Sequence, residues 1–255
     1  GMRARRIYGH ISLMKKYRSI FLSDIHMGKT RSGYGGAKPN VDPLLKFIKN
    51  KEFDFVYLVG DIFDIWELLM NWKWESKYNT FIQEILRLSQ QGSKIYYITG
   101  NHDDILERMY GLDFNGIEFC KQVIHTTAKK KKFFVSHGQD YDPINKITGP
   151  IRQISYSSPK SLSWIPSKLV DWCHSIVIKL SNKTKLEGVQ RYKERIMKKC
   201  YKENYDGVIC GHLHHPQIQT LKKGKIYINT GDSVSNFTVV TENAQGNFKL
   251  HKLRH

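Results

Sequence analysis

The chain has 255 residues, of which 40% are hydrophobic and 12% aromatic, a composition that fills the core of a large globular domain and excludes a wholly disordered chain. Its formal net charge of +18 favours polyanionic partners such as nucleic acid, anionic lipid or a phosphate-bearing substrate, without choosing among them. No internal repeat is visible, and no uninterrupted apolar run approaches the roughly 18 residues that a membrane span needs.

The cysteines and the first residues indicate the compartment and the domain limits. No cysteine pair has C-x-x-C spacing and no secretory signal is visible, so we expect reduced thiols in a cytoplasmic protein, with peripheral contact to an anionic membrane left open. We expect residues 1–18 to be a basic extension, with the natural start at Met2 or Met14, and residues 19–255 to form the domain. The cysteines are Cys120, Cys173, Cys200 and Cys210.

Three apolar runs in the first half predict buried strands, and each ends in polar residues. The runs and their endings are Ser19–Ser23 with Asp24-Ile25-His26, Phe53–Val59 with Gly60-Asp61, and Lys94–Thr99 with Gly100-Asn101-His102-Asp103. Asp42, as the N-cap, and Pro43 predict the start of a helix, and a second helix is predicted at about 78–90. This alternation implies a largely parallel sheet, whose ligands collect at the carboxyl ends of the strands.

In the second half, strands are predicted at Ile117–Thr126, at Lys132–Ser136, which ends in His137-Gly138, and at Val208–Cys210, which ends in Gly211-His212-Leu213-His214. Lys225–Asn229 and Asn236–Thr241 are predicted to form a second sheet edge, joined by a turn at 230–233, before a last strand at Phe248–Leu253.

The stretch at about 141–201 has no strand pattern and predicts a helix at about 167–180 and a basic helix at about 187–201. Two interpretations stay open for it. It forms either a helical cap over the site or an ordinary helical layer on the sheet.

Seven side chains at or near these strand ends have the chemistry of metal ligands: Asp24, His26, Asp61, Asn101, His137, His212 and His214. Carboxylate and imidazole together suit Mn, Fe, Zn or Co. So many ligands exceed one tetrahedral ion and suit two ions about 3.5–4 Å apart, bridged by a carboxylate. Such a pair holds a hydroxide nucleophile and polarises a phosphoryl oxygen, so we expect a substrate with a phosphate ester or anhydride bond.

The motifs Asp24-x-His26, Gly60-Asp61-x-x-Asp64, Gly100-Asn101-His102-Asp103, His137-Gly138 and Gly211-His212-x-His214 resemble, in this order, those of the calcineurin-like metallophosphoesterase superfamily. The resemblance covers nearly all of the chain except 141–201. It implies an α/β fold, a four-layer αββα sandwich with a two-metal site.

The same resemblance implies a role for each matching residue. Asp24, His26, Asp61 and His214 would hold the first metal, with Asp61 bridging, and Asn101, His137 and His212 would complete the second. His102 would donate a hydrogen bond or proton near the leaving oxygen, oriented by Asp103.

A narrower resemblance, carried by residues 57–66, the helical insertion and residues 209–215, is to the UDP-2,3-diacylglucosamine diphosphatase group. Enzymes of that group cleave the pyrophosphate of a lipid-linked nucleotide sugar in lipid A synthesis and release UMP, and their helical insertion forms a cap that receives acyl chains. Its best-known branch has Arg where this chain has His102.

Two other functions are weighed against this one. A phosphodiesterase or nuclease on the same scaffold suits the basic charge, but no basic stripe interleaved with stacking aromatics supports it. A non-catalytic, metal-stabilised binding protein would lack a ligand, and none is missing. The oligomeric state is left open.

Overall fold

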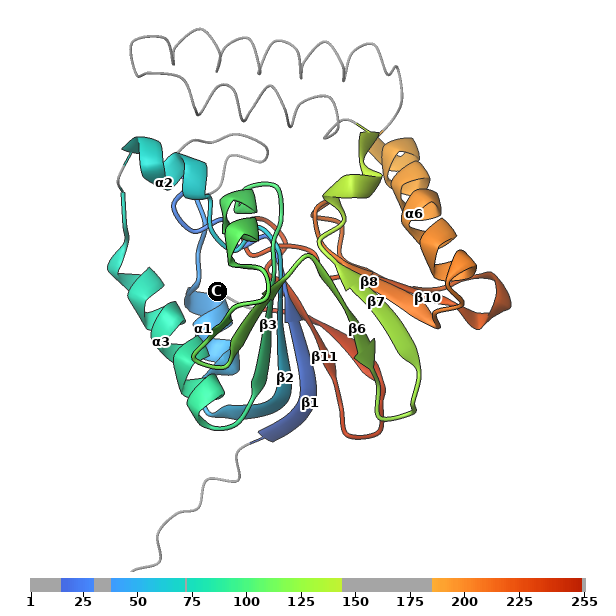
Figure 1. Ribbon diagram of the computed structural model, residues 1–255, viewed down its shortest axis with the longest axis horizontal. Helices are drawn as coiled ribbons and strands as arrows, with labels where there is room; N and C mark the ends of the chain where they lie inside the picture. The colour runs from blue at the N-terminus through green and yellow to red at the C-terminus, as the bar shows by residue number, and fades with distance from the viewer. Residues whose placement is uncertain (1–14, 30–37, 72, 144–184, 254–255) are drawn as a thin grey trace, which may run out of the picture.

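The computed structural model describes residues 15–29, 38–71, 73–143 and 185–253, and its layers run helix, sheet, sheet, helix (Figure 1). A seven-stranded sheet has the order β12-β11-β1-β2-β3-β5-β4 and a five-stranded sheet the order β6-β7-β8-β10-β9. This is the predicted α/β sandwich.

The middle of the seven-stranded sheet is parallel, since β1, β2, β3 and β5 run the same way, while β11, β12 and β4 are antiparallel to their neighbours. Its strands are β1 (Lys15–Leu22), β2 (Lys51–Val59), β3 (Lys94–Ile98), β4 (Asp113–Phe114), β5 (Ile117–Cys120), β11 (Thr238–Glu242) and β12 (Phe248–Lys252). The predicted basic extension therefore runs into β1, which begins at Lys15.

In the five-stranded sheet β7, β8 and β10 are parallel, and the outer strands are antiparallel to them. Its strands are β6 (Gln122–Thr126), β7 (Lys132–Ser136), β8 (Gly207–Cys210), β9 (Gln217–Thr220) and β10 (Ile226–Asn229). The described helices are α1 (Asp42–Ile48), α2 (Ile65–Asn71), α3 (Ser76–Gln90) and α6 (Lys185–Lys202), with short 3-10 turns η1 (Asp104–Met109), η2 (Gln139–Tyr141) and η3 (Lys222–Gly224).

Both faces of the central strands are buried, and alternate residues belong to different cores. On β1, Ile20 and Leu22 pack under α1 and α3, whereas Phe21 points between the two sheets. On β8, Ile209 points between the sheets and Val208 packs under α6. This burial explains why the strands read as continuous apolar runs in the sequence.

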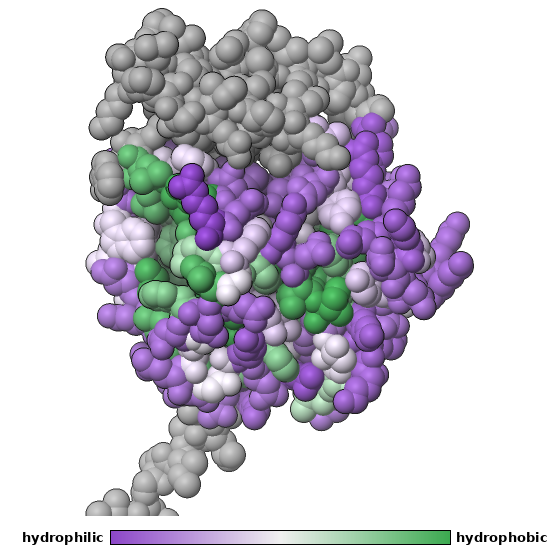
Figure 2. All heavy atoms as spheres, viewed as in Figure 1, coloured by the Kyte–Doolittle hydropathy of each residue, from purple (hydrophilic) through white to green (hydrophobic). Residues whose placement is uncertain are grey.

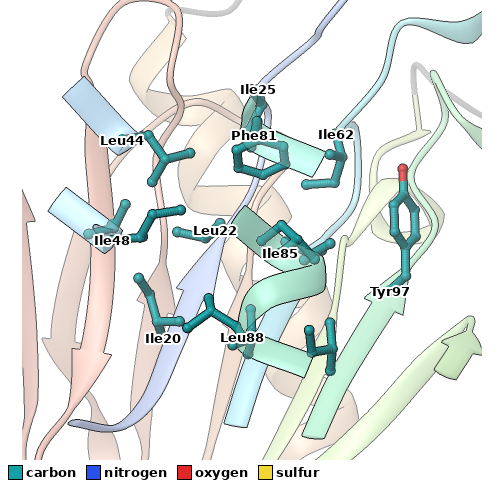
Figure 3. Close-up of a cluster of buried hydrophobic side chains, with 14 of the residues drawn as sticks. Ile20, Leu22, Ile25, Leu44, Ile48, Ile62, Phe81, Ile85, Leu88 and Tyr97 are labelled. Carbon is teal, nitrogen blue, oxygen red and sulfur yellow. The ribbon is translucent and has the colours of Figure 1, made fainter. Parts of the chain in front are cut away.

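Helix α3 covers the outer face of the seven-stranded sheet with side chains spaced three or four residues apart. Tyr78, Phe81, Ile85 and Leu88 are buried there (Figure 3). This spacing places one apolar stripe on the sheet, as the sequence predicted.

Helix α6 covers the five-stranded sheet in the same way and forms the fourth layer. Its buried side chains include Tyr192, Ile196 and Cys200, while Lys198 and Lys202 are exposed on a face that is largely hydrophilic in Figure 2. The basic helix predicted at about 187–201 is thus a layer on the sheet. The helix predicted at about 167–180 lies outside the described residues.

Three details of the prediction are wrong. The single strand predicted at Ile117–Thr126 is two strands in different sheets, β5 and β6, because the chain turns at Lys121 without a glycine or proline to mark the corner. Strands β10 and β11 also lie in different sheets. Helix α1 begins at Asp42 itself, after Val41, and Asn40 Oδ1 accepts the Asp42 N–H.

The described helices and cysteines bear on membrane insertion and on disulfide formation. None of the described helices has the length and apolarity that a membrane crossing requires. Cys120, Cys200 and Cys210 are free thiols.

Candidate metal centre

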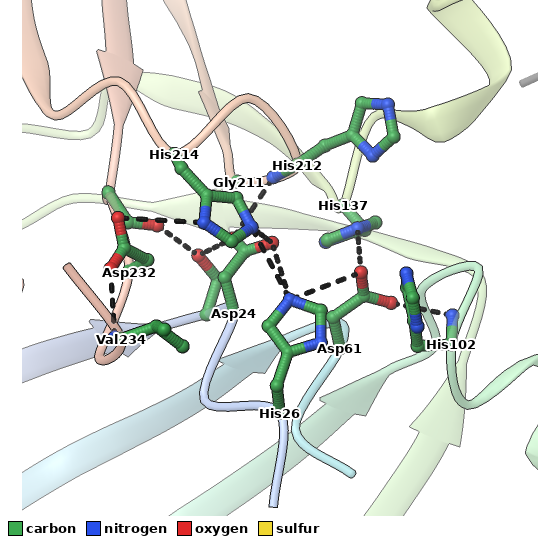
Figure 4. A network of polar contacts seen from close by, with 12 residues as sticks. Asp24, His26, Asp61, His102, His137, Gly211, His212, His214, Asp232 and Val234 are labelled. Carbon is green, nitrogen blue, oxygen red and sulfur yellow. Dashed lines mark hydrogen bonds and ion pairs between the residues drawn. The ribbon is translucent and has the colours of Figure 1, made fainter. Parts of the chain in front are cut away.

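The carboxyl ends of β1 and β2 are tied to each other by backbone hydrogen bonds beyond the sheet. The N–H of Asp24 donates to Gly60 O at 3.0 Å, and that of His26 donates to Asp61 O at 2.9 Å. These bonds bring the side chains of Asp24, His26 and Asp61 to one place, where His137 from β7 and His214 from β8 meet them (Figure 4).

Five of the predicted ligands have left-handed backbone conformations, which residues other than glycine adopt rarely. Their φ angles are 51° at Asp24, 53° at His26, 54° at Asp61, 69° at His212 and 51° at His214. Such conformations persist where the surrounding structure enforces them, and they concentrate at functional sites.

Asp24, His26 and His214 form a first group whose ligand atoms all lie within 4.8 Å of one another. His214 Nε2 is 3.2 Å from Asp24 Oδ1 and 3.3 Å from His26 Nε2. Two imidazole nitrogens and a carboxylate oxygen facing one point make a donor set for a divalent transition-metal ion.

Asp61 belongs to two further groups, one with Asp24 and His137 and one with His26 and His102. Asp61 Oδ2 lies 3.2 Å from His137 Nε2 and 3.9 Å from His26 Nε2. The Asp61 carboxylate therefore lies where it can serve two neighbouring ions.

Several buried atoms at this place lack the hydrogen bonds that buried polar atoms normally make. Asp24 Oδ1, Asn101 Oδ1 and His137 Nε2 have no hydrogen-bond partner among the described residues. Buried ligand atoms left without a partner in this way are those that a cation would coordinate, so the residues present fit divalent metal ions.

Each of the four predicted histidine ligands also has an oxygen near its other ring nitrogen. Metal-bound histidines usually have such a partner, which fixes the ring orientation. His137 Nδ1 is hydrogen-bonded to Val59 O at 2.8 Å and His212 Nε2 to Asp142 Oδ2 at 2.9 Å. The carboxylates near the other two rings lie beyond hydrogen-bond distance, Asp64 Oδ2 at 3.8 Å from His26 Nδ1 and Asp232 Oδ2 at 3.6 Å from His214 Nδ1.

His212 is not among the three groups. Its backbone N–H donates to Asp24 Oδ2 at 3.0 Å, and its ring centroid lies 5.3 Å from that of His137 (Figure 4). Its Nε2 lies beside Asp142, so Nδ1 is the ring nitrogen that stays available as a ligand atom. Its role as a ligand of the second ion, like that of Asn101, stays a prediction.

The buried charges of the centre depend on one another. Burial by itself would raise the pKa of Asp24, but His214 and His137 outweigh it and lower that pKa to about 2. Burial would lower the pKa of His137, but Asp61 and Asp24 outweigh it and raise that pKa to about 10. The two carboxylates are therefore anions that draw positive charge into the centre.

The structure corrects the predicted partner of His102. Asp103 does not orient its ring: Asp103 Oδ1 accepts the Gly100 N–H at 2.6 Å, and Oδ2 accepts the Tyr97 hydroxyl at 2.6 Å. Asp103 is fully buried and holds the loop after β3 in shape, and its burial raises the pKa to about 6.

Asp64 takes the place beside the ring, with its Oδ2 3.2 Å from His102 Nδ1. Sequence reasoning missed this role, although Asp64 stands in the motif Gly60-Asp61-x-x-Asp64. It also missed Asp142 and Asp232, for which the sequence offered no motif.

Glycines in the motifs make room for the ligands. A Cβ at Gly100 would lie 2.2 Å from Asp61 Oδ1, and one at Gly211 would lie 2.4 Å from Asp24 Oδ2. Carbon and oxygen atoms do not approach that closely, so any side chain there would displace a carboxylate of the centre.

A family model described as calcineurin-like phosphoesterase matches residues 17–216. The chain belongs to the calcineurin-like phosphoesterase family. Phosphoesterases of this family are metal-dependent hydrolases that act on phosphate bonds, and the strand ends of this chain carry groups of His and Asp side chains that could hold a metal ion.

Curated relatives cover most of the chain. UDP-2,3-diacylglucosamine hydrolase of Aliivibrio fischeri (strain MJ11) is 23% identical over 91% of this chain and 97% of its own length. The protein of the same name from Blochmanniella pennsylvanica (strain BPEN) is 24% identical over 81% of this chain and 82% of its own. Among solved structures, Vacuolar Protein Sorting 29 from Cryptosporidium parvum aligns with a TM-score of 0.46 at 15% identity, over 92% of this chain and 91% of that one.

Proposed function

We propose that the protein hydrolyses a pyrophosphate bond in a lipid-linked nucleotide sugar, UDP-2,3-diacylglucosamine or a close relative of it, with two divalent metal ions, Mn being the first choice. The observation that carries the proposal is the set of His and Asp side chains at the strand ends, in a chain that aligns along most of its length with hydrolases named for that substrate.

The first ion would be held by Asp24, His26 and His214, and the bridging Asp61 would be shared with the second. Asn101, His137 and His212 would complete the second site. The facing atoms of the first group, the shared position of Asp61 and the open lone pairs of Asn101 and His137 support this assignment.

When bound, the two ions supply a hydroxide nucleophile and neutralise charge on the phosphoryl oxygens. His102 is suited to act on the opposite side of the phosphorus. Its side chain is 28% exposed, whereas Asp64 beside it is 3% exposed, so part of the ring is open to solvent while its Nδ1 lies beside the carboxylate. Its other nitrogen then faces the substrate and donates a hydrogen bond or proton to the leaving oxygen.

The substrate class is tested by incubating the protein with Mn²⁺ and UDP-2,3-diacylglucosamine and measuring UMP by chromatography. We expect UMP release that an Asp61→Ala variant loses. UDP-N-acetylglucosamine, which lacks the two acyl chains, is the matched control for the lipid part. Equal turnover of both nucleotide sugars would overturn the lipid-linked assignment.

Two generic probes separate this function from the alternatives. Hydrolysis of bis(p-nitrophenyl) phosphate or single-stranded DNA, without UMP release, would instead support the phosphodiesterase or nuclease. Absence of turnover of every phosphoester and phosphoanhydride with Mn, Fe, Zn and Co would support the non-catalytic, metal-stabilised protein.

Contact with an anionic membrane follows as part of the proposal, because the substrate is a lipid. Arg195, Lys198 and Lys202 are exposed on α6 and add positive charge to one face, and each basic side chain near such a surface contributes about 1 kcal/mol. Sedimentation with phosphatidylglycerol vesicles, but not with phosphatidylcholine vesicles, is the expected result.

A further inference from the structure

The connection between β10 and β11, residues 230–237, crosses from one sheet to the other, and its Asp232 lies beside Asp24 and His214. The sequence marks it only as a turn. In the structure its residues touch both Asp24 and His214, which come from different sheets.

On the Asp24 side the contacts are made through the backbone and through Ser23. The N–H of Ser233 donates to Asp24 O at 3.1 Å. Ser23 Oγ lies 2.6 Å from Thr230 Oγ1, 3.1 Å from Gly231 O and within hydrogen-bond distance of Asp24 Oδ2, to one of which its single proton is donated. The connection therefore holds the carboxylate of Asp24 from behind.

On the His214 side the contacts are made by Asp232 and Asn236. Asp232 Oδ2 lies 3.6 Å from His214 Nδ1, while His214 Nε2 faces Asp24 (Figure 4). Asn236 Nδ2 donates to His214 O at 2.9 Å and to Asp232 Oδ2 at 2.5 Å. Asn236 thus holds the backbone of His214, and the Asp232 carboxylate lies beside its ring.

Asp232 is itself fixed by the turn that it stands in. Its side chain is 0% exposed. Its Oδ1 accepts the N–H groups of Val234 at 2.8 Å and of Asn236 at 3.0 Å, and also that of Ser235. With one oxygen held in this way, the other has a fixed direction toward the imidazole.

We propose that Asp232 is a positioning residue for the first metal, holding His214 Nδ1 so that Nε2 points at the ion. The proposal rests on the two-metal centre proposed above. A carboxylate beside the outer nitrogen fixes the tautomer and makes the coordinating nitrogen more basic, and loss of such a partner typically weakens metal binding about 10–100-fold.

The test is calorimetric titration of Mn²⁺ into chelator-stripped full-length protein, which needs no substrate. Asp232→Asn keeps the size of the side chain and one oxygen for the turn but removes the charge beside His214. We expect binding of one of the two Mn²⁺ ions to weaken by about 10–100-fold and the other to change little. Asn236→Ala keeps the Asp232 charge and its turn but removes the Asn236 Nδ2 contacts to Asp232 Oδ2 and His214 O, so it should give a smaller loss at the same ion.

Glu242→Gln is the matched control, because it also neutralises a 0%-exposed carboxylate that contacts a histidine, His125, away from the centre. It should bind Mn²⁺ like the parent, and thermal unfolding of the stripped proteins reports general destabilisation. Parent-like Mn²⁺ binding by Asp232→Asn, or an equal loss in Glu242→Gln, would overturn the role of Asp232 and leave the two-metal proposal standing. A parent that binds no divalent ion would overturn both.

Discussion

His102 Nδ1 lies 3.2 Å from Asp64 Oδ2. The ring of His102 also belongs to a group with His26 and Asp61 whose ligand atoms could meet at one ion. The two contacts favour different roles for His102. The contact with Asp64 suits a donor to the leaving group, whereas the group with His26 and Asp61 suits a metal ligand.

His102→Ala separates the two roles. We expect kcat to fall about 10²–10⁴-fold, the usual contribution of a general acid, while the affinity for Mn²⁺ stays as in the parent. His26→Ala is the control and should lose both turnover and Mn²⁺. Measurements of kcat and of the calorimetric Mn²⁺ affinity distinguish the two roles. Weaker Mn²⁺ binding by His102→Ala would show that His102 is a ligand.

Asp142→Asn is expected to weaken the second ion. Asp142 Oδ2 lies 2.9 Å from His212 Nε2, so the substitution removes the charge that holds this ring, and binding should weaken about tenfold. Asp140→Asn is the control, because Asp140 pairs with Lys121 at the surface, with both side chains 53% exposed. Mn²⁺ titration of both variants checks this, and equal binding by the two would contradict the role of Asp142.

Gly100→Ala should disrupt the centre by size alone. The added Cβ would lie 2.2 Å from Asp61 Oδ1 and 2.6 Å from Asp61 N, an overlap that costs about 1–3 kcal/mol or moves the carboxylate. Gly188→Ala in α6 is the control, since its Cβ would meet nothing within 4 Å and should stabilise the helix by about 0.5–1 kcal/mol. Urea unfolding and Mn²⁺ binding of the two variants measure the contrast. Parent-like Mn²⁺ binding by Gly100→Ala would contradict the prediction and show that the loop after β3 can move to accommodate the added methyl group.

Glu242→Gln should destabilise the protein in a way that depends on pH. Glu242 Oε2 lies 2.7 Å from His125 Nε2 and accepts Ser19 Oγ at 2.9 Å. Burial alone would raise the pKa of Glu242, but His125 and the Ala128 N–H outweigh it and lower that pKa below its ordinary 4.5. Breaking such a buried pair costs about 3–5 kcal/mol.

Because the folded-state pKa is lowered, the stabilisation from Glu242 is present above the ordinary pKa and is lost as pH falls through the lowered one. The difference in unfolding free energy between parent and Glu242→Gln should therefore be largest near about pH 7 and shrink below about pH 4. Urea unfolding at several pH values measures it, and a difference that does not change with pH would contradict the assignment.

Much of the fold could be predicted from the sequence because the central strands are buried on both faces and several of them run into a motif with a glycine or an acid. The apolar runs before Asp24 and Asp61 show this pattern. The strand at 117–126 does not reveal its division between two sheets, because apolar residues continue on both sides of Lys121.

The candidate site, too, could be predicted from the sequence only in part. Residues that would touch an ion stand in short motifs, so Asp24, His26 and His214 could be named before any geometry was known, and the structure brings them together. The carboxylates next to the histidines could not be named in this way, because Asp142 and Asp232 come close to His212 and His214 only when the chain folds. The partner of His102 was misassigned for the same reason, since adjacency in sequence favoured Asp103 over Asp64.

The candidate ligands of the centre come from both sheets. Asp24 and Asp61 follow strands of the seven-stranded sheet, and His137 and His214 follow strands of the five-stranded sheet. The proposed ions would therefore connect the two sheets at the carboxyl ends of their strands. Metal binding at such a centre would couple to folding, since ions that bind only the folded state stabilise it by an amount that grows with the logarithm of their concentration. Scarcity of metal in the cell would then lower the amount of folded protein as well as its turnover.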